Sequence, residues 1–395
     1  MTRVLAGPWA AQMLADMGAE VIKIERPGTG DDARTYGPPY LKDADGKDTL
    51  ENAFYLSANR GKKSVQADIA TPQGQEIVRS LAGKSDVFIE NFRVGVLSKY
   101  QLDYASLAAV NPARLYCSIT GFGQTGPYRE RPGYDAIFQG MGGLMSVTGP
   151  KDGAPGAGPV KVGPSIVDIL CGLFTSNAVL GALHGRAATG VGQHIDVSLL
   201  DSVVAAMSHY AQIYLVSGEV PPRRGTEGNG GFPSGMFACA DGQMMLTAGN
   251  DRQFAQLCDA MGRPQLAADE RFKTNNLRVI NRSELTAAME ECFTRKPMAY
   301  WLEILDRVGV PAGPINDLAQ VFDNEQVIAR GMQVRVQHPL AGEISLVGNP
   351  IRYSRTPLDT SRAPPMLGQN TAEVLRDLLG FSEERIASYC NEMSR

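Results

Sequence analysis

The first two hundred residues alternate short β-branched runs with helical patterns, and this alternation constrains the fold more than any other feature. A strand–helix–strand order implies right-handed crossovers and therefore a parallel sheet. The runs typical of buried strands lie at residues 21–24, 63–69, 86–90, 115–119 and 193–197. We therefore expect an α/β fold.

The pattern changes after residue 120. Residues 121–163 are rich in Gly and Pro and predict a long loop, of the kind that is usually functional. Long helices are predicted at 168–188 and 199–215. A glycine cluster at 225–235 follows, then a predicted hairpin at 237–246. Further helices are predicted at 251–261, 282–294 and 298–308.

Composition excludes several classes of protein. The net charge of -4 gives no global attraction to nucleic acid or to an anionic membrane. Six cysteines contain no C-x-x-C pair and four histidines form no H-E-x-x-H, so we expect neither a disulfide framework nor a zinc site. We find no leader pattern and no apolar run of about 18 residues. A cytoplasmic protein without a membrane partner is expected.

Asp168 is the carboxylate with the clearest chemical potential. It opens an apolar helix, where aspartate serves as an N-cap worth about 1 kcal/mol. A helix N-terminus also keeps an aspartate ionised, as a carboxylate nucleophile requires. The sequence alone leaves both interpretations open.

The first strand–turn–helix unit resembles a nucleotide-binding unit but lacks the G-x-G-x-x-G fingerprint. Glu25 stands near the position of a ribose-binding acid, and Arg26 suits a phosphate. A solvated Glu–Arg pair is the alternative. Asn91, just past a predicted strand, belongs to the sheet edge where α/β proteins bind ligands.

A series of short motifs runs through nearly the whole chain. They read R-V-L-A-G-P-W-A from Arg3, G-A-E-V-I-K-I-E-R-P from Gly18, I-E-N-F-R-V-G from Ile89, S-I-T-G-F-G-Q-T-G-P from Ser118, R-P-G-Y-D from Arg131, V-D-I-L-C-G around Asp168, G-Q-H-I-D-V-S-L-L-D-S from Gly192 and M-L-G-Q-N-T from Met366. In this order the chain resembles the class III coenzyme A-transferases, the formyl-CoA and carnitine-CoA transferase (CaiB/BaiF-like) family.

The resemblance implies a Rossmann-like large domain with a parallel sheet built from both chain ends, a smaller inserted α+β domain and an interlocked homodimer. The implied bounds are 1–198 for the first part of the large domain, 199–225 for a linker helix, 226–312 for the small domain, 313–333 for a linker and 334–395 for the returning C-terminal part.

The implied chemistry moves CoA from an acyl-CoA to a free carboxylic acid. Asp168 attacks the donor thioester, giving a mixed anhydride and then an aspartyl-CoA thioester. CoA is then a substrate, with no tightly bound cofactor and no metal. Arg223 and Arg224 are candidates for the far carboxylate of a dicarboxylic acid, or belong to a solvated linker.

The resemblance also assigns contacts. Those to the coenzyme are Leu5, Ala6, Arg26, Ala67, Asp68, Ile69, Ala70, Asn91, Phe92, Arg93, Lys99, Tyr134 and Asp135. A mobile loop over the intermediates is assigned to Gly228, Asn229, Gly230 and Gly231.

The chain departs from the family pattern in two places. Family members usually begin with a further strand, so either the true start lies upstream or the sheet is one strand short. Leu5 stands where some members carry glutamine, which disfavours formyl-CoA and oxalate as substrates. One alternative is an α-methylacyl-CoA racemase, although Tyr134 takes the place of its histidine and a phenol is a poor base near neutrality. Another is a CoA-binding protein without activity.

Overall fold

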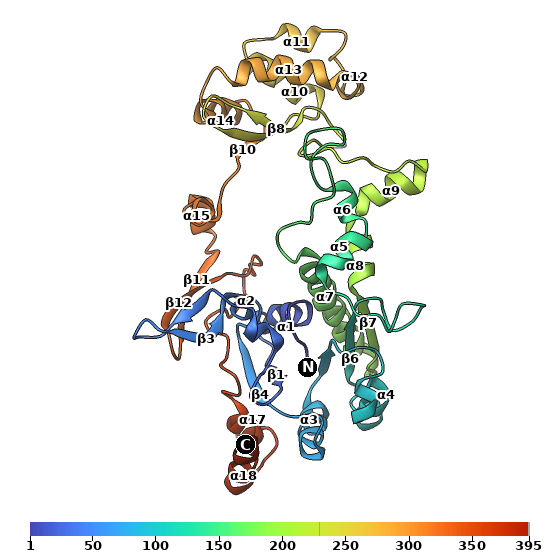
Figure 1. Ribbon diagram of the computed structural model, residues 1–395, viewed down its shortest axis with the longest axis vertical. Coiled ribbons are helices and arrows are strands. Elements are labelled where there is room, and N and C mark those ends of the chain that lie inside the picture. The colour runs from blue at the N-terminus through green and yellow to red at the C-terminus, as the bar shows by residue number, and fades with distance from the viewer. Residues whose placement is uncertain (229, 394–395) are drawn as a thin grey trace. The chain divides into compact units, whose positions relative to one another are not determined.

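The computed structural model describes residues 1–228 and 230–393. The chain forms two compact units (Figure 1). Unit 1 contains Met1–Leu144, Lys161–Gly218 and Glu325–Arg395, whereas unit 2 contains Met145–Val160 and Glu219–Asn324. Each unit is described by itself below.

The observed division differs from the sequence-based bounds at residues 145–160. The sequence assigned them to the large domain, but their contacts lie within unit 2. Arg223 forms an ion pair with Asp152, and Lys151 Nζ lies 3.5 Å from a carboxylate oxygen of Glu227. A Gly- and Pro-rich composition predicts a loop but does not indicate which unit the loop contacts.

Unit 1 contains the parallel strands that the alternating pattern predicts. Strand β1 (Val21–Glu25) pairs in parallel with β4 (Lys62–Gln66). Strands β5 (Val87–Glu90), β6 (Leu115–Thr120) and β7 (His194–Ser198) form a second parallel sheet in that order. Among the described residues, no ladder joins β1 to β5.

Unit 1 also contains two antiparallel hairpins. One, β2 (Tyr40–Lys42) with β3 (Asp48–Asn52), was not predicted, because its strands are polar and irregular in register. The other pairs β11 (Gln333–His338) with β12 (Gly342–Val347). The helices of unit 1 are α1 (Ala6–Asp16), η1 (Asp32–Thr35), α2 (Ala53–Ala58), α3 (Pro72–Lys84), η2 (Leu97–Tyr100), α4 (Tyr104–Val110), α5 (Asp135–Met141), α7 (Ile166–Thr189), α8 (Leu199–Ala206), α9 (Ser208–Ser217), α16 (Glu325–Ala329), α17 (Thr371–Asp377) and α18 (Glu383–Met393), and α6 (Leu144–Val147) lies at the junction between the units.

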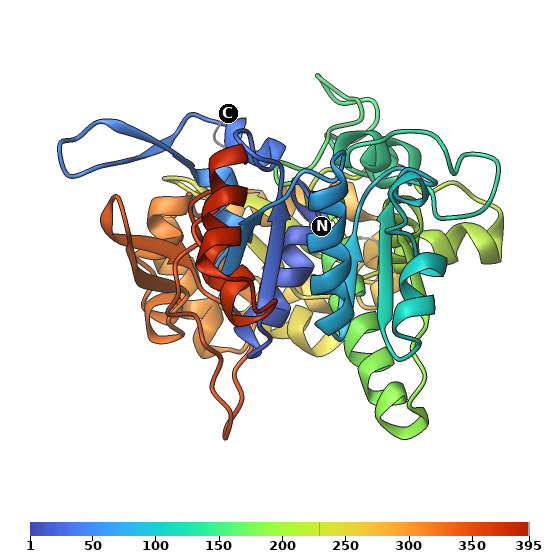
Figure 2. The same cartoon turned by 90° about the horizontal axis from the view of Figure 1, so that it is seen from below.

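Helices cover both faces of the parallel strands, because successive strand residues point to opposite sides. Tyr116 of β6 packs in a cluster with side chains of α3, α17 and α18. Its neighbour Cys117 packs in another cluster, with side chains of α1, α5, α7 and α8. Figure 2 shows α3 in blue and α18 in red on the near side of the strands. The three layers explain why β5 and β6 are largely apolar.

Helix α7 contradicts one expectation from the sequence. It is long and apolar enough, by length and composition, to cross a membrane, although no such run was expected. Small residues on α7 let it lie close to α1. A Cβ added at Gly172 would lie 2.8 Å from the carbonyl oxygen of Ala6.

The single helix expected at residues 199–215 is in fact two helices. Helix α8 ends before Met207, and α9 begins at Ser208, whose φ is +45°. A left-handed backbone at a serine interrupts the helix, and nothing in the local sequence signals it.

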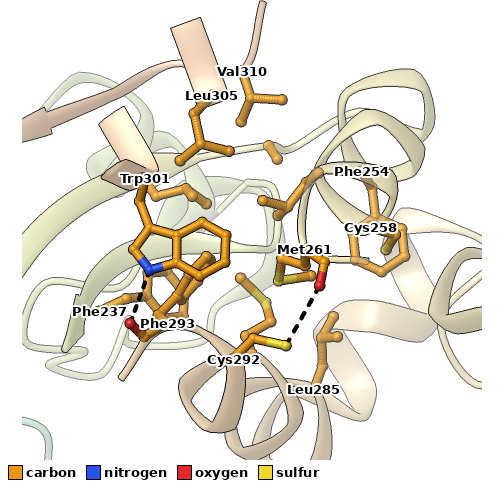
Figure 3. Close-up of a cluster of buried hydrophobic side chains, with 14 of the residues drawn as sticks. Phe237, Phe254, Cys258, Met261, Leu285, Cys292, Phe293, Trp301, Leu305 and Val310 are labelled. Carbon is orange, nitrogen blue, oxygen red and sulfur yellow. Dashed lines mark hydrogen bonds between the residues drawn. The ribbon is translucent and has the colours of Figure 1, made fainter. Parts of the chain in front are cut away.

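Unit 2 is a three-stranded antiparallel sheet covered by helices. The strand order is β10 (Ala312–Pro314), β9 (Gln243–Thr247), β8 (Ser234–Ala238), which confirms the predicted hairpin. Its core holds Trp301, whose indole nitrogen donates to the carbonyl of Phe293 at 2.9 Å (Figure 3). The helices are α10 (Asp251–Ala260), α11 (Gln265–Ala268), α12 (Asn275–Ile280), α13 (Arg282–Phe293), α14 (Met298–Arg307) and α15 (Leu318–Phe322).

Candidate active site

Asp168 lies in the first turn of α7, but it is not the N-cap. The capping position belongs to Ser165, whose side chain makes no capping hydrogen bond. The N-cap interpretation of Asp168 is therefore wrong. Asp168 is partly buried, and no ion pair of it is found among the described residues. Its carboxylate is not required to hold the helix end, which leaves it available for chemistry.

Burial and, as the smaller cause, the neighbouring carboxylate of Asp135 together raise the pKa of Asp168 to about 7. Burial thus opposes the ionisation that a helix N-terminus favours in an aspartate. A carboxylate that titrates near neutrality is typical of a functional site rather than of a solvated cap.

Asp135 caps α7 from the side. Its Oδ1 accepts from the backbone N–H of Val167 at 2.8 Å and of Asp168 at 3.3 Å. Its Oδ2 accepts from Gln139 Nε2 at 2.6 Å, and Asp135 is 7% exposed. The resemblance assigned Asp135 to the coenzyme, but in the structure its carboxylate accepts from the backbone of the turn that holds Asp168.

Tyr134 directly precedes Asp135 but is exposed, whereas Asp135 is buried. Tyr134 is 67% exposed, and its backbone is extended where α5 begins. Burial raises the pKa of Tyr36, and Tyr134 and Asp32 add to the effect, so Tyr36 lies in the same region. Sequence reasoning missed Tyr36, because it lies in an irregular segment without a motif.

A cavity of about 230 Å³ gathers five of the predicted coenzyme contacts. It opens at the carboxyl ends of β1 and β4, where α/β folds bind ligands. The five are Arg26, Ala67, Asp68, Ile69 and Phe92. Arg26 is exposed, with its guanidinium 3.6 Å from Asp32, so its charge remains accessible to a phosphate.

Asn91 lies at the same sheet edge, but its side-chain amide is hydrogen-bonded to the protein backbone. Its Oδ1 accepts from the N–H of Arg3 at 2.9 Å, and its Nδ2 donates to the carbonyl of Arg3 at 2.8 Å. The Arg3 guanidinium lies 5.5 Å from the ring centre of Phe92. Asn91 therefore positions the N-terminal segment that lines the cavity.

The remaining predicted contacts divide into buried and exposed residues. Leu5 and Ala6 are buried at the start of α1, and Ala6 packs in the same cluster as Val167, beside Asp168. Ala70, Arg93 and Lys99 are exposed, and neither basic side chain forms an ion pair within residues 1–228 and 230–393. None of these three lines the cavity.

Glu25 is not a ribose-binding acid. It is buried, and it accepts from Arg34 Nε at 2.9 Å and from Ser64 Oγ at 2.7 Å. Burial opposes its ionisation, but Arg34 and Lys23 hold its pKa down at about 2. Glu25 therefore belongs to a buried charge network under the cavity.

Asp31 completes that network and was not singled out from the sequence. It accepts from Lys23 Nζ at 2.6 Å and from the backbone N–H of Val4 at 2.9 Å. The Gly-rich context of Asp31 predicts a turn, and only the fold brings it under the N-terminal segment. The network fixes the cavity floor.

The predicted glycine loop lies in unit 2. Gly228 donates its N–H to the carbonyl of Ser234 at 3.1 Å, and the carbonyl of Gly230 accepts from Asn275 at 3.1 Å. A Cβ on Gly231 would lie 2.8 Å from Gly249 Cα, so glycine is required there. Asn229 lies outside the described residues.

Arg223 and Arg224 differ in their bonding. Arg223 is engaged by Asp152 and by the carbonyl of Ser146. The Nε of Arg224 is buried and finds no hydrogen-bond partner in the described part of the chain. The same part of the chain contains no group of His, Cys, Asp and Glu side chains that could hold a metal ion.

Comparison with known proteins shows the family to which the chain belongs. The model of CoA-transferase family III matches residues 1–371. The chain is 42% identical over 386 residues to the succinyl-CoA:glutarate CoA-transferase of Homo sapiens, covering 98% of this chain and 86% of that protein. It is 45% identical over 378 residues to the succinate–glutarate CoA-transferase of Agrobacterium fabrum, covering 96% and 93%.

A solved structure gives the same result. A CAIB/BAIF family protein from Brucella suis superimposes with a TM-score of 0.83 at 44% identity, covering 96% of this chain and 97% of that one. The resemblance seen in the motifs is thereby confirmed. The chain belongs to CoA-transferase family III and is a CoA-transferase.

Proposed function

We propose that this enzyme moves CoA from succinyl-CoA to a short dicarboxylic acid such as glutarate, with Asp168 as the nucleophile. The observation that carries the proposal is the partly buried Asp168 carboxylate in the first turn of α7, with its pKa raised to about 7. The substrates follow the relatives that share 42% and 45% identity with this chain.

The reaction proceeds through the aspartate side chain. A carboxylate oxygen of Asp168 attacks the thioester carbonyl, the C–S bond breaks, and a mixed anhydride and the CoA thiolate form. The thiolate attacks the aspartyl carbonyl and releases the donor acid, leaving aspartyl-CoA. The acceptor carboxylate attacks that thioester, and the released thiolate then attacks the acceptor carbonyl of the new anhydride. Asp168 is regenerated and no proton is consumed.

The coenzyme occupies the cavity at the ends of β1 and β4. Arg26 meets a phosphate there, and Phe92 offers an apolar wall. Arg93 and Lys99 are exposed cations suited to the outer phosphates. Ala6 reaches the nucleophile's turn through the α1–α7 packing.

That Arg224 meets the second carboxylate of a dicarboxylic acid stays a prediction from the sequence. The buried Nε of Arg224 finds no partner among the described residues, and a buried donor without a partner costs about 1–3 kcal/mol. A substrate carboxylate would satisfy it. Gly228, Gly230 and Gly231 then belong to the loop that covers the intermediates, a role that the sequence also predicted for Asn229.

The enzyme is further proposed to be a cytoplasmic, interlocked homodimer. Helix α9 buries none of its side chains within the chain, and Leu215 and Val216 are 72% and 78% exposed. Contiguous exposed apolar surface marks an interaction site. The mass of the particle in solution tests this, since a monomer at micromolar concentration contradicts it.

The decisive experiment incubates the enzyme with succinyl-CoA and a panel of free acids, and identifies the new thioesters by mass spectrometry. We expect glutaryl-CoA to form, with monocarboxylic acids at least tenfold slower. Arg224→Ala should raise KM for glutarate and leave that of a monocarboxylic acid unchanged. If monocarboxylic acids in the panel accept CoA faster than dicarboxylic acids, the substrate assignment is wrong.

The control variant is Asp168→Ala. We expect it to lose transfer while still binding CoA, because its side chain makes no capping bond. Wild type quenched in hydroxylamine should carry a hydroxamate on Asp168. Turnover by the alanine variant at the wild-type rate contradicts the assignment of the nucleophile.

A further inference from the structure

Gln139 is a fully buried glutamine on α5, one helical turn after Asp135. Residues four apart on a helix share a face, so the two side chains can pair. Gln139 Nε2 donates to Asp135 Oδ2 at 2.6 Å. The other carboxylate oxygen of Asp135 accepts from the N–H groups of Val167 and Asp168. Gln139 thus fixes which oxygen of Asp135 faces the first turn of α7.

The opposite side of the same amide holds the loop that leads into α7. Residues 161–165 have no regular secondary structure, so their backbone groups need partners from elsewhere in the fold. Gln139 Oε1 accepts from the N–H of Val162 at 2.8 Å, and Gln139 Nε2 lies 3.5 Å from the carbonyl oxygen of Pro164. One side chain therefore holds both the loop before Asp168 and the carboxylate beside it.

These partners leave the Gln139 amide one orientation. The amide nitrogen only donates hydrogen bonds, and the amide oxygen only accepts them. A flipped amide would set its oxygen against the Asp135 carboxylate and its NH2 group against the N–H of Val162. Both contacts would be buried and unsatisfied, which costs free energy. Gln139 is therefore a fixed bridge between Asp135 and the loop.

Packing holds α5, which carries this bridge, against α7. Phe138, the neighbour of Gln139, is fully buried in the cluster that contains Val167 and Cys171 of α7. Figure 1 shows α5 beside α7. Because the core fixes the backbone of α5, the Gln139 amide is a rigid support for the turn that contains Asp168.

We propose that Gln139 is a positioning residue for CoA transfer, which acts on the Asp168 carboxylate through Asp135 and the loop before α7. The inference rests on the proposed role of Asp168 as the nucleophile. An attacking atom must lie about 3–3.5 Å from the carbon that it attacks, and a misplacement of about 1 Å costs roughly 100-fold in rate. Gln139 is fully buried, so its replacement should slow the attack and leave the affinity for CoA unchanged.

The test replaces Gln139 by methionine, which keeps an unbranched side chain of similar length and removes the amide. The enzyme is mixed with succinyl-CoA, and the formation of aspartyl-CoA is followed by mass spectrometry, with peptide mapping to Asp168. We expect Gln139→Met to form this adduct roughly 10- to 100-fold more slowly than wild type. The Kd for CoA, measured by calorimetry, should not change.

Two outcomes separate this inference from the proposed function. Wild type that forms the adduct on Asp168, with an equal rate in Gln139→Met, overturns the inference alone. Wild type that forms no adduct on Asp168 contradicts the proposed function and overturns the inference with it. A weaker affinity for CoA in Gln139→Met, at an unchanged rate of adduct formation, also overturns the inference.

The matched control is Gln12→Met. Gln12 is another buried glutamine of unit 1, which donates to the carbonyl of Ser57 at 3.1 Å and accepts from the N–H of Arg60 at 2.8 Å. Both methionine variants lose hydrogen bonds of a buried amide, so both should lower Tm. Only Gln139→Met should slow the adduct. Equal slowing in the two variants means a general loss of stability and overturns the proposal.

A double variant, Asp135→Asn with Gln139→Glu, exchanges the two groups of the bridge. The amide at position 135 can then donate to the carboxylate at position 139, and its oxygen can still accept from the first turn of α7. The carboxylate can still accept from the N–H of Val162, and the pair keeps one negative charge. We expect an adduct rate roughly two- to twelvefold above that of Gln139→Met, the range of one restored hydrogen bond. A double variant as slow as Gln139→Met overturns the role of the bridge.

Discussion

Asp135→Asn tests whether Asp135 tunes the pKa of Asp168, the proposed nucleophile, as well as capping α7. Asparagine keeps an oxygen for the N–H groups of Val167 and Asp168, at 2.8 and 3.3 Å in the wild type. It removes the negative charge that raises the pKa of Asp168 and leaves burial, the larger cause, in place. The pKa of Asp168 should therefore fall, though not to its ordinary value.

The size of the fall follows from Coulomb's law. Two charges about 6 Å apart interact by about 2–3 kcal/mol at an effective dielectric constant of about 20, and hydrogen bonding of Asp135 to backbone amides reduces this. We expect the pKa of Asp168 to drop by about one unit. At pH 6, the ionised fraction of the nucleophile then rises about fivefold.

The assay is the pH profile of kcat/KM, which reports the free enzyme's titrating groups. In the proposed mechanism activity needs ionised Asp168. We therefore expect activity to fall as pH drops through the pKa of Asp168, near 7 in wild type and about one unit lower in Asp135→Asn. The variant loses a favourable contact with Gln139, so its maximum rate falls as well. Loss of structure alone lowers the whole profile without moving it.

The matched control is Asp103→Asn. Asp103 caps α4, accepting from Ser106 N–H at 3.4 Å, and does not contribute to the pKa of Asp168. The Asp103→Asn substitution removes one capping charge from the same unit, and it should leave the acid limb of the pH profile at its wild-type position. Superimposable acid limbs for wild type and Asp135→Asn would refute the electrostatic role of Asp135.

Three further predictions concern the coenzyme, the alternative chemistry and stability. Arg26→Ala should weaken CoA binding roughly 10- to 150-fold, the range of a charge-assisted hydrogen bond. If Arg26 contacts the ribose phosphate, the same variant should weaken dephospho-CoA binding much less. Equal losses for the two ligands in calorimetry place Arg26 on the pyrophosphate or off the site. A 2-methylacyl-CoA incubated with the enzyme in heavy water, without acceptor acid, should gain no deuterium at its α-carbon. The reason is that a phenol, such as that of the 67% exposed Tyr134, is a poor base near neutrality. Deuterium that appears at catalytic rates in mass spectrometry supports a racemase. Asp168→Asn should raise the free energy of unfolding in urea by up to roughly 4 kcal/mol at pH 8, because burial disfavours the charged form of Asp168. The gain should vanish near pH 4, where wild-type Asp168 is protonated. A gain that persists at pH 4 contradicts this linkage.

The sequence predicted the parallel strands of unit 1 because their signal is local. Strands buried on both faces require apolar β-branched runs, so β1, β5 and β6 could be found from composition alone. The break between α8 and α9 depends on the φ of Ser208, which no residue pattern signals. The hairpin of β2 and β3 is polar and lacked a strand pattern.

The candidate site was predicted in part, and its electrostatics were not. Arg26 and Phe92 were assigned to the coenzyme, and they line one cavity. The roles of Glu25 and Asp135 depend on partners far along the chain: Arg34 and Ser64 for one, the first turn of α7 for the other. Sequence alone does not show which carboxylates meet a cation and which meet another acid.

The contrast between Glu25 and Asp168 shows how one unit gives two carboxylates opposite properties. Both are buried to some degree, and burial alone raises the pKa of each. Arg34 and Lys23 reverse the effect at Glu25, which stays charged and structural. The charged neighbour of Asp168 is a second carboxylate and not a cation, so no positive charge offsets the cost of burying its charged form. A desolvated, uncompensated carboxylate is the more reactive nucleophile once ionised, and the stability that it costs the fold is the reason that Asp168→Asn should be the more stable protein.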